Sequence, residues 1–392
     1  MFKSAITKKN LSENFLFSSS VAADVSHPKK SEKAYEWWYF DALSDDGREA
    51  IVIIFLDNFV FSPRYNSANN QPNPDFRMRN ADLENAENRK ENETTNPKSE
   101  ICNPKSQCPA IAFTYYRNGK PVYRAINEFP AKEFQASEKK PECRIGENYF
   151  RFESAPYGSG YVISINAKLQ KNRRLEAHFE WLSIESDFLP EKDINLENAH
   201  SWNLVVSRSD VSGKITVKEK NGKISDVVNF RGTGYHDHNL DNRWLPETVS
   251  DWQWGRAHFS DATAVFYRYK ELDSKEPLTK LFVIRNNKFS DCDARLEENK
   301  FSRHYFGIRY PQKLHFETED NWQLQVEQKK VIDASFFYLR FLSEITLSLP
   351  DSKPHQTIGI TEHLAPKTLK YRWLDWLVNM RIGRGDKGSF LH

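Results

Sequence analysis

The chain has 392 residues, which is enough for two domains of ordinary size. Its 56 lysines and arginines nearly balance 54 aspartates and glutamates, and the net charge of +2 gives no sign of a nucleic-acid-binding protein. Aromatic residues make up 14% of the chain, a fraction that favours strands and apolar pockets.

The cysteines and the apolar runs point to the cytoplasm. Cys102, Cys108, Cys143 and Cys292 show neither CxxC spacing nor a zinc pattern, which favours a reduced chain. Residues 1–26 lack the apolar segment of a secretory signal, and the longest apolar run, residues 50–56, is too short for a membrane span. We therefore expect a cytoplasmic protein.

The N-terminal third combines a hairpin with two irregular segments. Residues 1–30 are polar and are predicted to form a flexible arm. Glu36-Trp-Trp-Tyr-Phe-Asp41 and residues 51–55 are β-rich and flank a turn that ends at Gly47, which predicts a hairpin. Residues 66–109 are rich in Asn, Pro, Glu, Lys and Ser and contain a short internal repeat. We expect a disordered insertion there, with partner binding as the alternative.

Short strands separated by polar breaks fill most of the remaining chain. One series runs from about residue 111 to residue 217, and a second begins near Asp251. Regular short strands predict an all-β sandwich or barrel. Because Asp251-Trp-Gln-Trp254 echoes Glu36-Trp-Trp-Tyr39, we interpret the chain as two similar barrels in tandem, an N-terminal domain over 31–240 and a C-terminal domain over 241–392.

The C-terminal tail carries a helical pattern. Leu369, Trp373, Trp376, Leu377 and Met380 follow helical spacing, and this predicts a helix over 368–382 that ends at a glycine. One interpretation is a helix that packs on the barrel. The other is an interfacial helix that makes peripheral contact with a membrane.

The segment Gly232-Thr-Gly-Tyr-His-Asp-His-Asn239 carries the clearest chemical pattern. In a strand, His236 and His238 share a face and Asp237 points to the other. Three readings stay open: a metal-binding His pair that lacks an obvious third ligand nearby, histidines satisfied by backbone carbonyls, and an acid–base site. The acid–base reading uses Asp237 to orient an imidazole, or uses the carboxyl itself as a proton donor, since an apolar pocket raises a carboxyl pKa.

Other catalytic signatures are missing from the sequence. It contains no G-x-S-x-G elbow, no P-loop and no G-x-G-x-x-G ahead of a helix. These absences argue against hydrolases, kinases and nicotinamide-dependent enzymes.

Five motifs in order resemble the carotenoid 1,2-hydratase (hydroxyneurosporene synthase) family and its lipocalin-like relatives, which include fungal Diels–Alderases. They are Glu36-Trp-Trp-Tyr-Phe-Asp41, His200-Ser-Trp202, the Gly232–Asn239 segment, Asp251-Trp-Gln-Trp-Gly-Arg256 and Gly359-Ile-Thr-Glu362. The resemblance implies two lipocalin-like antiparallel β-barrels, a pocket at or between them, a hydrophobic polyene or isoprenoid substrate, and neither metal nor cofactor.

The resemblance also implies residue roles. His238 matches a histidine that the hydratases are thought to need, and Tyr267 matches a family tyrosine. Two family residues differ here, because Leu240 replaces a frequent tryptophan and Tyr269 stands where the family has an acid. The proton would then come from Asp237, Glu36 or Asp261.

We therefore expect a cofactor-free hydratase that protonates a terminal double bond, with Asp237, His238 and Tyr267 as catalytic residues. The alternatives are a cyclase of the Diels–Alderase type and a non-catalytic carrier of apolar ligands. The expected substrate-binding residues are Glu36, Trp37, Tyr39, His236, Asn239, Trp252, Trp254, Arg256 and Tyr269.

Overall fold

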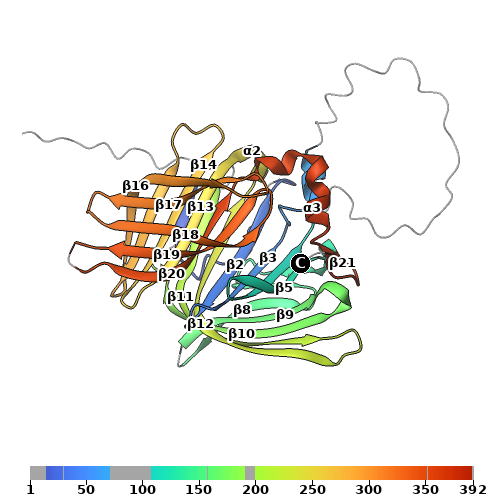
Figure 1. Ribbon diagram of the computed structural model, residues 1–392. Coiled ribbons are helices and arrows are strands. Elements are labelled where there is room, and N and C mark those ends of the chain that lie inside the picture. Colours follow the sequence, from blue (N-terminus) through green and yellow to red (C-terminus); the bar gives the residue numbers. More distant parts are fainter. Residues whose placement is uncertain are drawn as a thin grey trace, which may run out of the picture.

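The computed structural model describes residues 15–29, 31–70, 107–156, 158–189, 199–350 and 352–390. Strands dominate this part of the chain and build two separate sheets, one from each half, which confirms the predicted all-β class (Figure 1). Among these residues, no helix is both long enough and apolar enough to cross a bilayer.

The first sheet contains thirteen described strands. Its hydrogen-bonded order is β21-β5-β4-β3-β2-β12-β11-β10-β9-β8-β7-β6, and β1 pairs in parallel with β11. The strands are β1 (Phe15–Ser18), β2 (Tyr35–Ser44), β3 (Glu49–Leu56), β4 (Ala110–Arg117), β5 (Lys120–Glu128), β6 (Phe134–Ala136), β7 (Glu142–Ile145), β8 (Asn148–Ala155), β9 (Gly158–Lys168), β10 (Arg174–Ser186), β11 (His200–Lys218), β12 (Ile224–Asp241) and β21 (Gly383–Arg384).

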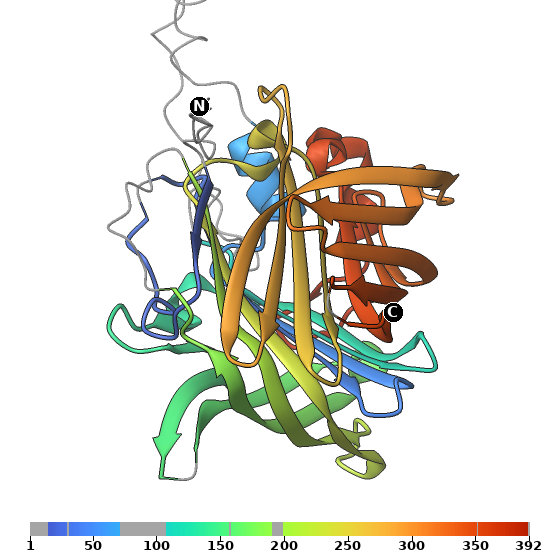
Figure 2. The same ribbon diagram turned by 90° about the vertical axis from the view of Figure 1, so that its left-hand side faces the viewer.

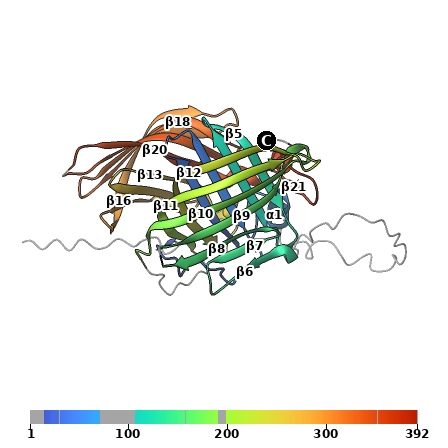
Figure 3. The same ribbon diagram turned by 90° about the horizontal axis from the view of Figure 1, so that it is seen from below.

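This first sheet is curled and open, whereas we predicted a barrel. The curl brings distant strands together around an apolar core, so that the rings of Phe113 on β4 and Phe179 on β10 stack with centroids 6.4 Å apart (Figure 3). The sheet does not close, because the edge of β5 pairs with β21 from the C-terminal tail and not with β6.

The second sheet is the closed antiparallel barrel that we predicted. Its first strand pairs with its last, which closes the barrel. Aromatic side chains such as Phe266 and Phe316 fill the interior. Its strands are β13 (Val249–His258), β14 (Ala262–Glu271), β15 (Leu278–Arg285), β16 (Lys288–Arg303), β17 (Arg309–Thr318), β18 (Gln323–Ala334), β19 (Tyr338–Ser348) and β20 (His355–Leu364).

The outside of the barrel packs against one face of the first sheet (Figure 2). Residues alternate between the two faces of a strand. On β13, Trp252 and Trp254 point out of the barrel and meet Trp37 and Tyr39 of β2, while Ala257 points into the barrel core. The chain passes from one sheet to the other between Asp241 and Val249, through α2 (Leu245–Thr248), and we keep the end of β12 as the proposed domain boundary.

The N-terminal segment is more ordered than the arm we expected. Residues 15–18 form β1, and the rings of Phe15 and Phe17 pack into the junction, 5.4 Å from Tyr267 and 4.5 Å from Phe282. These two apolar side chains gain burial there, which favours order. Of the predicted 66–109 insertion, residues 71–106 lie outside the described residues, whereas the start belongs to α1 (Pro63–Asn69).

The tail contains a small helix, but the predicted 368–382 helix is broken into short pieces. They are the 3₁₀ turns η5 (Pro366–Lys370) and η6 (Arg372–Leu374), followed by α3 (Asp375–Asn379). Tyr371 lies between η5 and η6, and its extended backbone angles interrupt the helical conformation there. Leu369, Leu374 and Val378 are buried, and Trp373 and Trp376, which we placed on the apolar face of the helix, point outward. Two further 3₁₀ turns are η2 (Ala131–Glu133) and η3 (Gln170–Asn172).

Candidate active site

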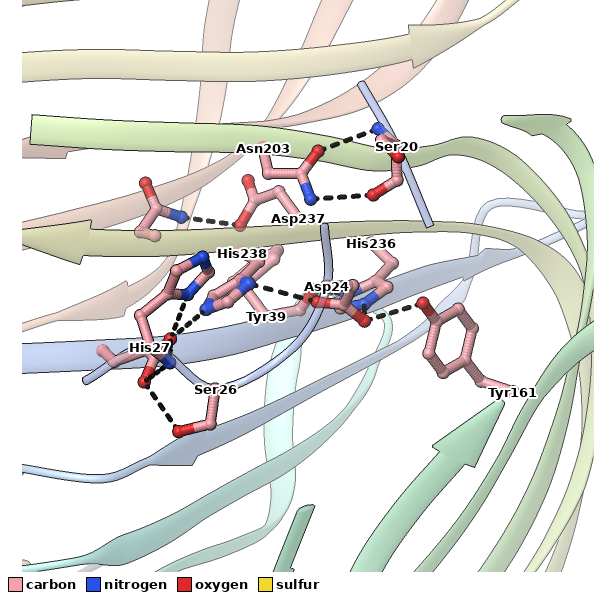
Figure 4. Close-up of polar contacts among 12 residues, drawn as sticks. Ser20, Asp24, Ser26, His27, Tyr39, Tyr161, Asn203, His236, Asp237 and His238 are labelled. Carbon is pink, nitrogen blue, oxygen red and sulfur yellow. Dashed lines mark hydrogen bonds and ion pairs between the residues drawn. The ribbon is translucent and has the colours of Figure 1, made fainter. Parts of the chain in front are cut away.

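Strand β12 carries the Tyr235–Asn239 motif and presents it on two opposite faces. Its antiparallel pairing with β2 places Asp237 opposite Tyr39 and His238 opposite Trp38. Asp237 faces the barrel, whereas His236 and His238 face the interior of the curled sheet (Figure 4). The backbone of β12 therefore separates Asp237 from His238, and the acid–base pair that we expected does not form.

The Asp237 carboxyl is buried among hydrogen-bond donors. Its Oδ2 accepts from Trp202 Nε1 at 3.1 Å and from the Tyr235 hydroxyl at 2.8 Å, and its Oδ1 accepts from Asn239 Nδ2 at 2.8 Å. Burial raises the pKa of Asp237 to about 8, although the hydrogen bonds from Trp202 and Tyr235 lower it. A carboxyl with this pKa holds its proton at neutral pH and can still release it to a reacting group.

Asp237 lies at the wall of a small hollow between the two sheets. The residues that line this hollow are Trp37, Tyr39, Asp237, Asn239, Trp252, Trp254, Tyr267 and Glu362. Four of them, Trp37, Tyr39, Trp252 and Glu362, also line a larger neighbouring cavity of about 230 Å³, whose walls are mostly apolar. The shared walls show that the small hollow adjoins that cavity, at the junction between the two sheets.

A second carboxylate lines both hollows. Glu362 Oε1 accepts from the Tyr39 hydroxyl at 3.1 Å and from Arg340 Nε at 2.8 Å. Glu362 thus forms a buried ion pair with Arg340, while Asp237 is surrounded by neutral donors only. Such a pair of carboxyl groups in contrasting environments is suited to separate acid and base roles.

The other face of β12 holds a network of histidines and carboxylates. His236 Nε2 lies 2.9 Å from Asp24 Oδ2, and His238 Nε2 lies 2.9 Å from Glu36 Oε1. Burial alone lowers the pKa of His238, but hydrogen bonds and charges of Asp24 and Glu36 raise it to about 10. His238 is therefore a buried cation, which Asp24 and Glu36 neutralise.

Part of this network also has the donor set of a metal site. One ligand atom each from His27, Glu36 and His238 lies within 4.8 Å of the others. This group includes His238 but not His236, so it differs from the metal-binding His236/His238 pair that the sequence suggested. However, Glu36 Oε1 already lies at hydrogen-bond distance, 2.9 Å, from both His27 Nδ1 and His238 Nε2. These contacts satisfy the imidazole nitrogens through hydrogen bonds, so we treat the group as an ion-pair network.

The remaining expected residues do not line the hollow. Tyr269 stacks on His200 with ring centroids 5.0 Å apart. Arg256 donates from Nε to Asp41 Oδ1 at 2.8 Å, which fixes β13 against β2. Glu36, His236, His238, Arg256 and Tyr269 are absent from the described lining of both hollows. Asp261, considered as a proton donor, instead pairs with Arg285 near the surface.

Tyr267 reaches the hollow from β14. Its hydroxyl lies 2.9 Å from His200 Nε2, and its ring stacks on Trp202 with centroids 4.4 Å apart. Burial lowers the pKa of His200 to about 3, so this imidazole is neutral. Tyr267 is therefore held in place by His200 and Trp202 at the edge of the pocket.

Sequence reasoning missed several residues that shape the site. Tyr235, Trp202 and Arg340 position the two carboxyl groups, and Asp24 organises the histidines. Trp202, Tyr235 and Glu362 had a signal, because each belongs to one of the five motifs, but no role followed from their positions in the sequence.

Comparisons with known proteins agree with the motifs. The family described as carotenoid hydratase CrtC matches residues 181–390. A hydroxyneurosporene dehydrogenase of Chlorobaculum tepidum is 25% identical over 374 residues, which cover 93% of this chain and 91% of that protein. An acyclic carotenoid 1,2-hydratase of Thiocapsa roseopersicina is 54% identical over 41 residues, 10% of each chain.

Solved structures share the fold. A putative AttH of Nitrosomonas europaea has a TM-score of 0.56 at 12% identity and covers 89% of this chain and 97% of its own. The crystal structure of CghA with Sch210972 has a TM-score of 0.53 at 12% identity, with 90% and 97% covered. At this identity the similarity supports the two-sheet architecture alone.

Proposed function

Because this chain belongs to the carotenoid hydratase CrtC family, we propose that it is a hydratase that adds water to a double bond of a long apolar isoprenoid. We assign Asp237 as the general acid. The observation that carries the assignment is a buried carboxyl of raised pKa in an aromatic hollow that adjoins an apolar cavity. The proposed reaction uses this chain's own side chains and needs no cofactor.

The first step is proton transfer from Asp237 to an alkene carbon. Oδ1 accepts one hydrogen bond and Oδ2 accepts two, so we place the proton on Oδ1. When the proton leaves, the π electrons form the new C–H bond and the other alkene carbon becomes a tertiary cation. The donors Trp202, Tyr235 and Asn239 then stabilise the carboxylate that remains.

The second step is capture of the cation by water. Trp37, Trp252 and Trp254 line the small hollow, and the face of an aromatic ring stabilises positive charge without reacting with it. Water forms the C–O bond and gives its proton to Glu362, and return of that proton to Asp237 completes the addition of one water. The sum is alkene plus water to tertiary alcohol.

The test is turnover of lycopene or neurosporene by the wild-type protein and by Asp237→Asn. We expect a product heavier by one water from the wild type, and a rate lower by roughly 10²–10⁴-fold in the variant. Asp210→Asn is the matched control, since Asp210 is an exposed carboxyl on the neighbouring strand β11.

Three outcomes contradict the proposal. Undiminished turnover by Asp237→Asn removes Asp237 as the acid. A product of unchanged mass but new retention time indicates a cyclase. Equal ligand binding by both proteins without any product indicates a carrier.

A further inference from the structure

The C-terminal tail and one barrel loop form an end of the large cavity. Leu377, Val378 and Arg381 from the tail line it together with Phe306, from the loop between β16 and β17. The Arg381 guanidinium lies 6.0 Å from the centroid of the Phe306 ring, so the tail and the loop are in contact.

Large aromatic side chains project outward from this same end. Trp373 is 73% exposed and Trp376 is 56% exposed, on the tail that supplies the cavity wall. Tyr371 and Tyr305 are also exposed, and the Tyr305 ring lies 4.4 Å from the cavity-lining Phe306. Tryptophan is among the more buried residue types in soluble proteins, and its amphipathic ring favours the interface of a bilayer. We call these four residues the aromatic rim.

Positive charge accompanies the aromatic rim. Between Pro366 and Arg384 the chain has five basic residues and one acidic residue, whereas the whole protein has a net charge of only +2. Lys367 and Arg372, on the same tail as Trp373, are exposed. Each lysine or arginine close to an anionic bilayer contributes about 1 kcal/mol of attraction.

We propose that the aromatic rim docks the protein on a bilayer that contains anionic lipid and turns the large cavity toward the membrane. The tail lies in the interface without crossing it, because its helical pieces are only three to five residues long. The purpose of docking rests on the proposed function, since a long polyene is stored in lipid and would enter the cavity beside Leu377. Docking itself does not depend on the reaction.

The test measures cosedimentation with phosphatidylcholine vesicles, with and without phosphatidylglycerol. Wild-type protein is expected to bind the anionic vesicles, and added salt should weaken the binding. Trp373→Ser/Trp376→Ser should lower the affinity about tenfold or more, by loss of two interfacial anchors worth on the order of 1 kcal/mol each. Ile184→Ser/Ile224→Ser is the matched control, since both side chains are exposed apolar groups on the first sheet.

Two results overturn docking. One is absence of vesicle binding by the wild-type protein, and the other is equal binding by wild type and the double tryptophan variant. A wild-type dimer that the tryptophan changes convert to a monomer, without vesicle binding, shows instead a protein interface. All variants are first checked for an unchanged melting temperature.

A companion assay separates docking from the reaction. With substrate dissolved in detergent micelles, the double tryptophan variant should retain wild-type turnover, because neither indole lines the described cavity. If no protein hydrates the polyene, the proposed function fails while the vesicle result still decides docking.

Discussion

Replacement of Asp237 by asparagine should stabilise the fold while it removes the catalytic proton. Burial raises the pKa of Asp237 from 3.8 to about 8, so the folded protein holds this proton more tightly than the unfolded chain does. The associated stabilisation is fully present below about pH 4 and is lost as the pH rises through about 8. Above about pH 8 the wild type has lost roughly 6 kcal/mol of this stabilisation, because each pKa unit corresponds to about 1.4 kcal/mol.

Asparagine does not titrate, so the variant avoids this loss. Its amide oxygen can accept from Trp202 and Tyr235 as the carboxylate does, and a turned Asn239 amide can accept from its nitrogen. We therefore expect Asp237→Asn to have a higher free energy of unfolding than the wild type. The difference should grow from about pH 5 to about pH 8 and reach several kcal/mol.

Urea unfolding monitored by tryptophan fluorescence across this pH range provides the measurement. Asp210→Asn should follow the wild type at every pH, because Asp210 is exposed. A difference that does not change with pH, or an Asp237→Asn variant that loses stability more steeply toward high pH, would refute the reasoning. Either result would mean that the Asp237 carboxyl is already ionised in the folded protein.

Three further predictions follow from the same contacts. Turnover should fall about tenfold per pH unit above about pH 8, as Asp237 loses its proton, in a pH–rate profile of the wild type. Glu362→Gln should slow turnover by roughly 10²-fold without a change in ligand affinity, if Glu362 accepts the proton of water; unchanged turnover removes it as the base. Arg256→Met should lower the free energy of unfolding by about 3–5 kcal/mol, because Asp41 would remain buried and unpaired, and a melting curve like that of the wild type would contradict this.

Local patterns in the sequence predicted individual strands more reliably than whether a sheet closes into a barrel. Aromatic β-rich runs and the turn that ends at Gly47 correctly placed the hairpin of β2 and β3, and the run that starts near Asp251 correctly placed β13, the first strand of the barrel. Whether a sheet closes depends on which edges meet. The edge of β5 is occupied by β21, more than 250 residues further along the chain, and no local pattern encodes such a pairing.

The site was likewise predictable from local sequence patterns only in part. Alternation along β12 correctly put His236 and His238 on one face and Asp237 on the other, but we still expected Asp237 and His238 to act as a pair, and the structure separates them. Partners from distant segments decided the chemistry of each face, since Glu362 comes from β20 and Asp24 from the N-terminal segment. The prediction of one continuous helix over 368–382 was wrong for a related reason, because the helical spacing of apolar residues does not reveal that the backbone of Tyr371 is extended.

The histidine network joins neighbouring segments of the first sheet that the ribosome makes at very different times. Asp24 and Glu36 emerge early, whereas His236 and His238 emerge some two hundred residues later. Until β12 arrives, Asp24 lacks both of its imidazole partners and Glu36 has only His27, and this favours solvation of the early segment over burial. We therefore expect the first sheet to be completed only when the strand that bears Asp237 is available.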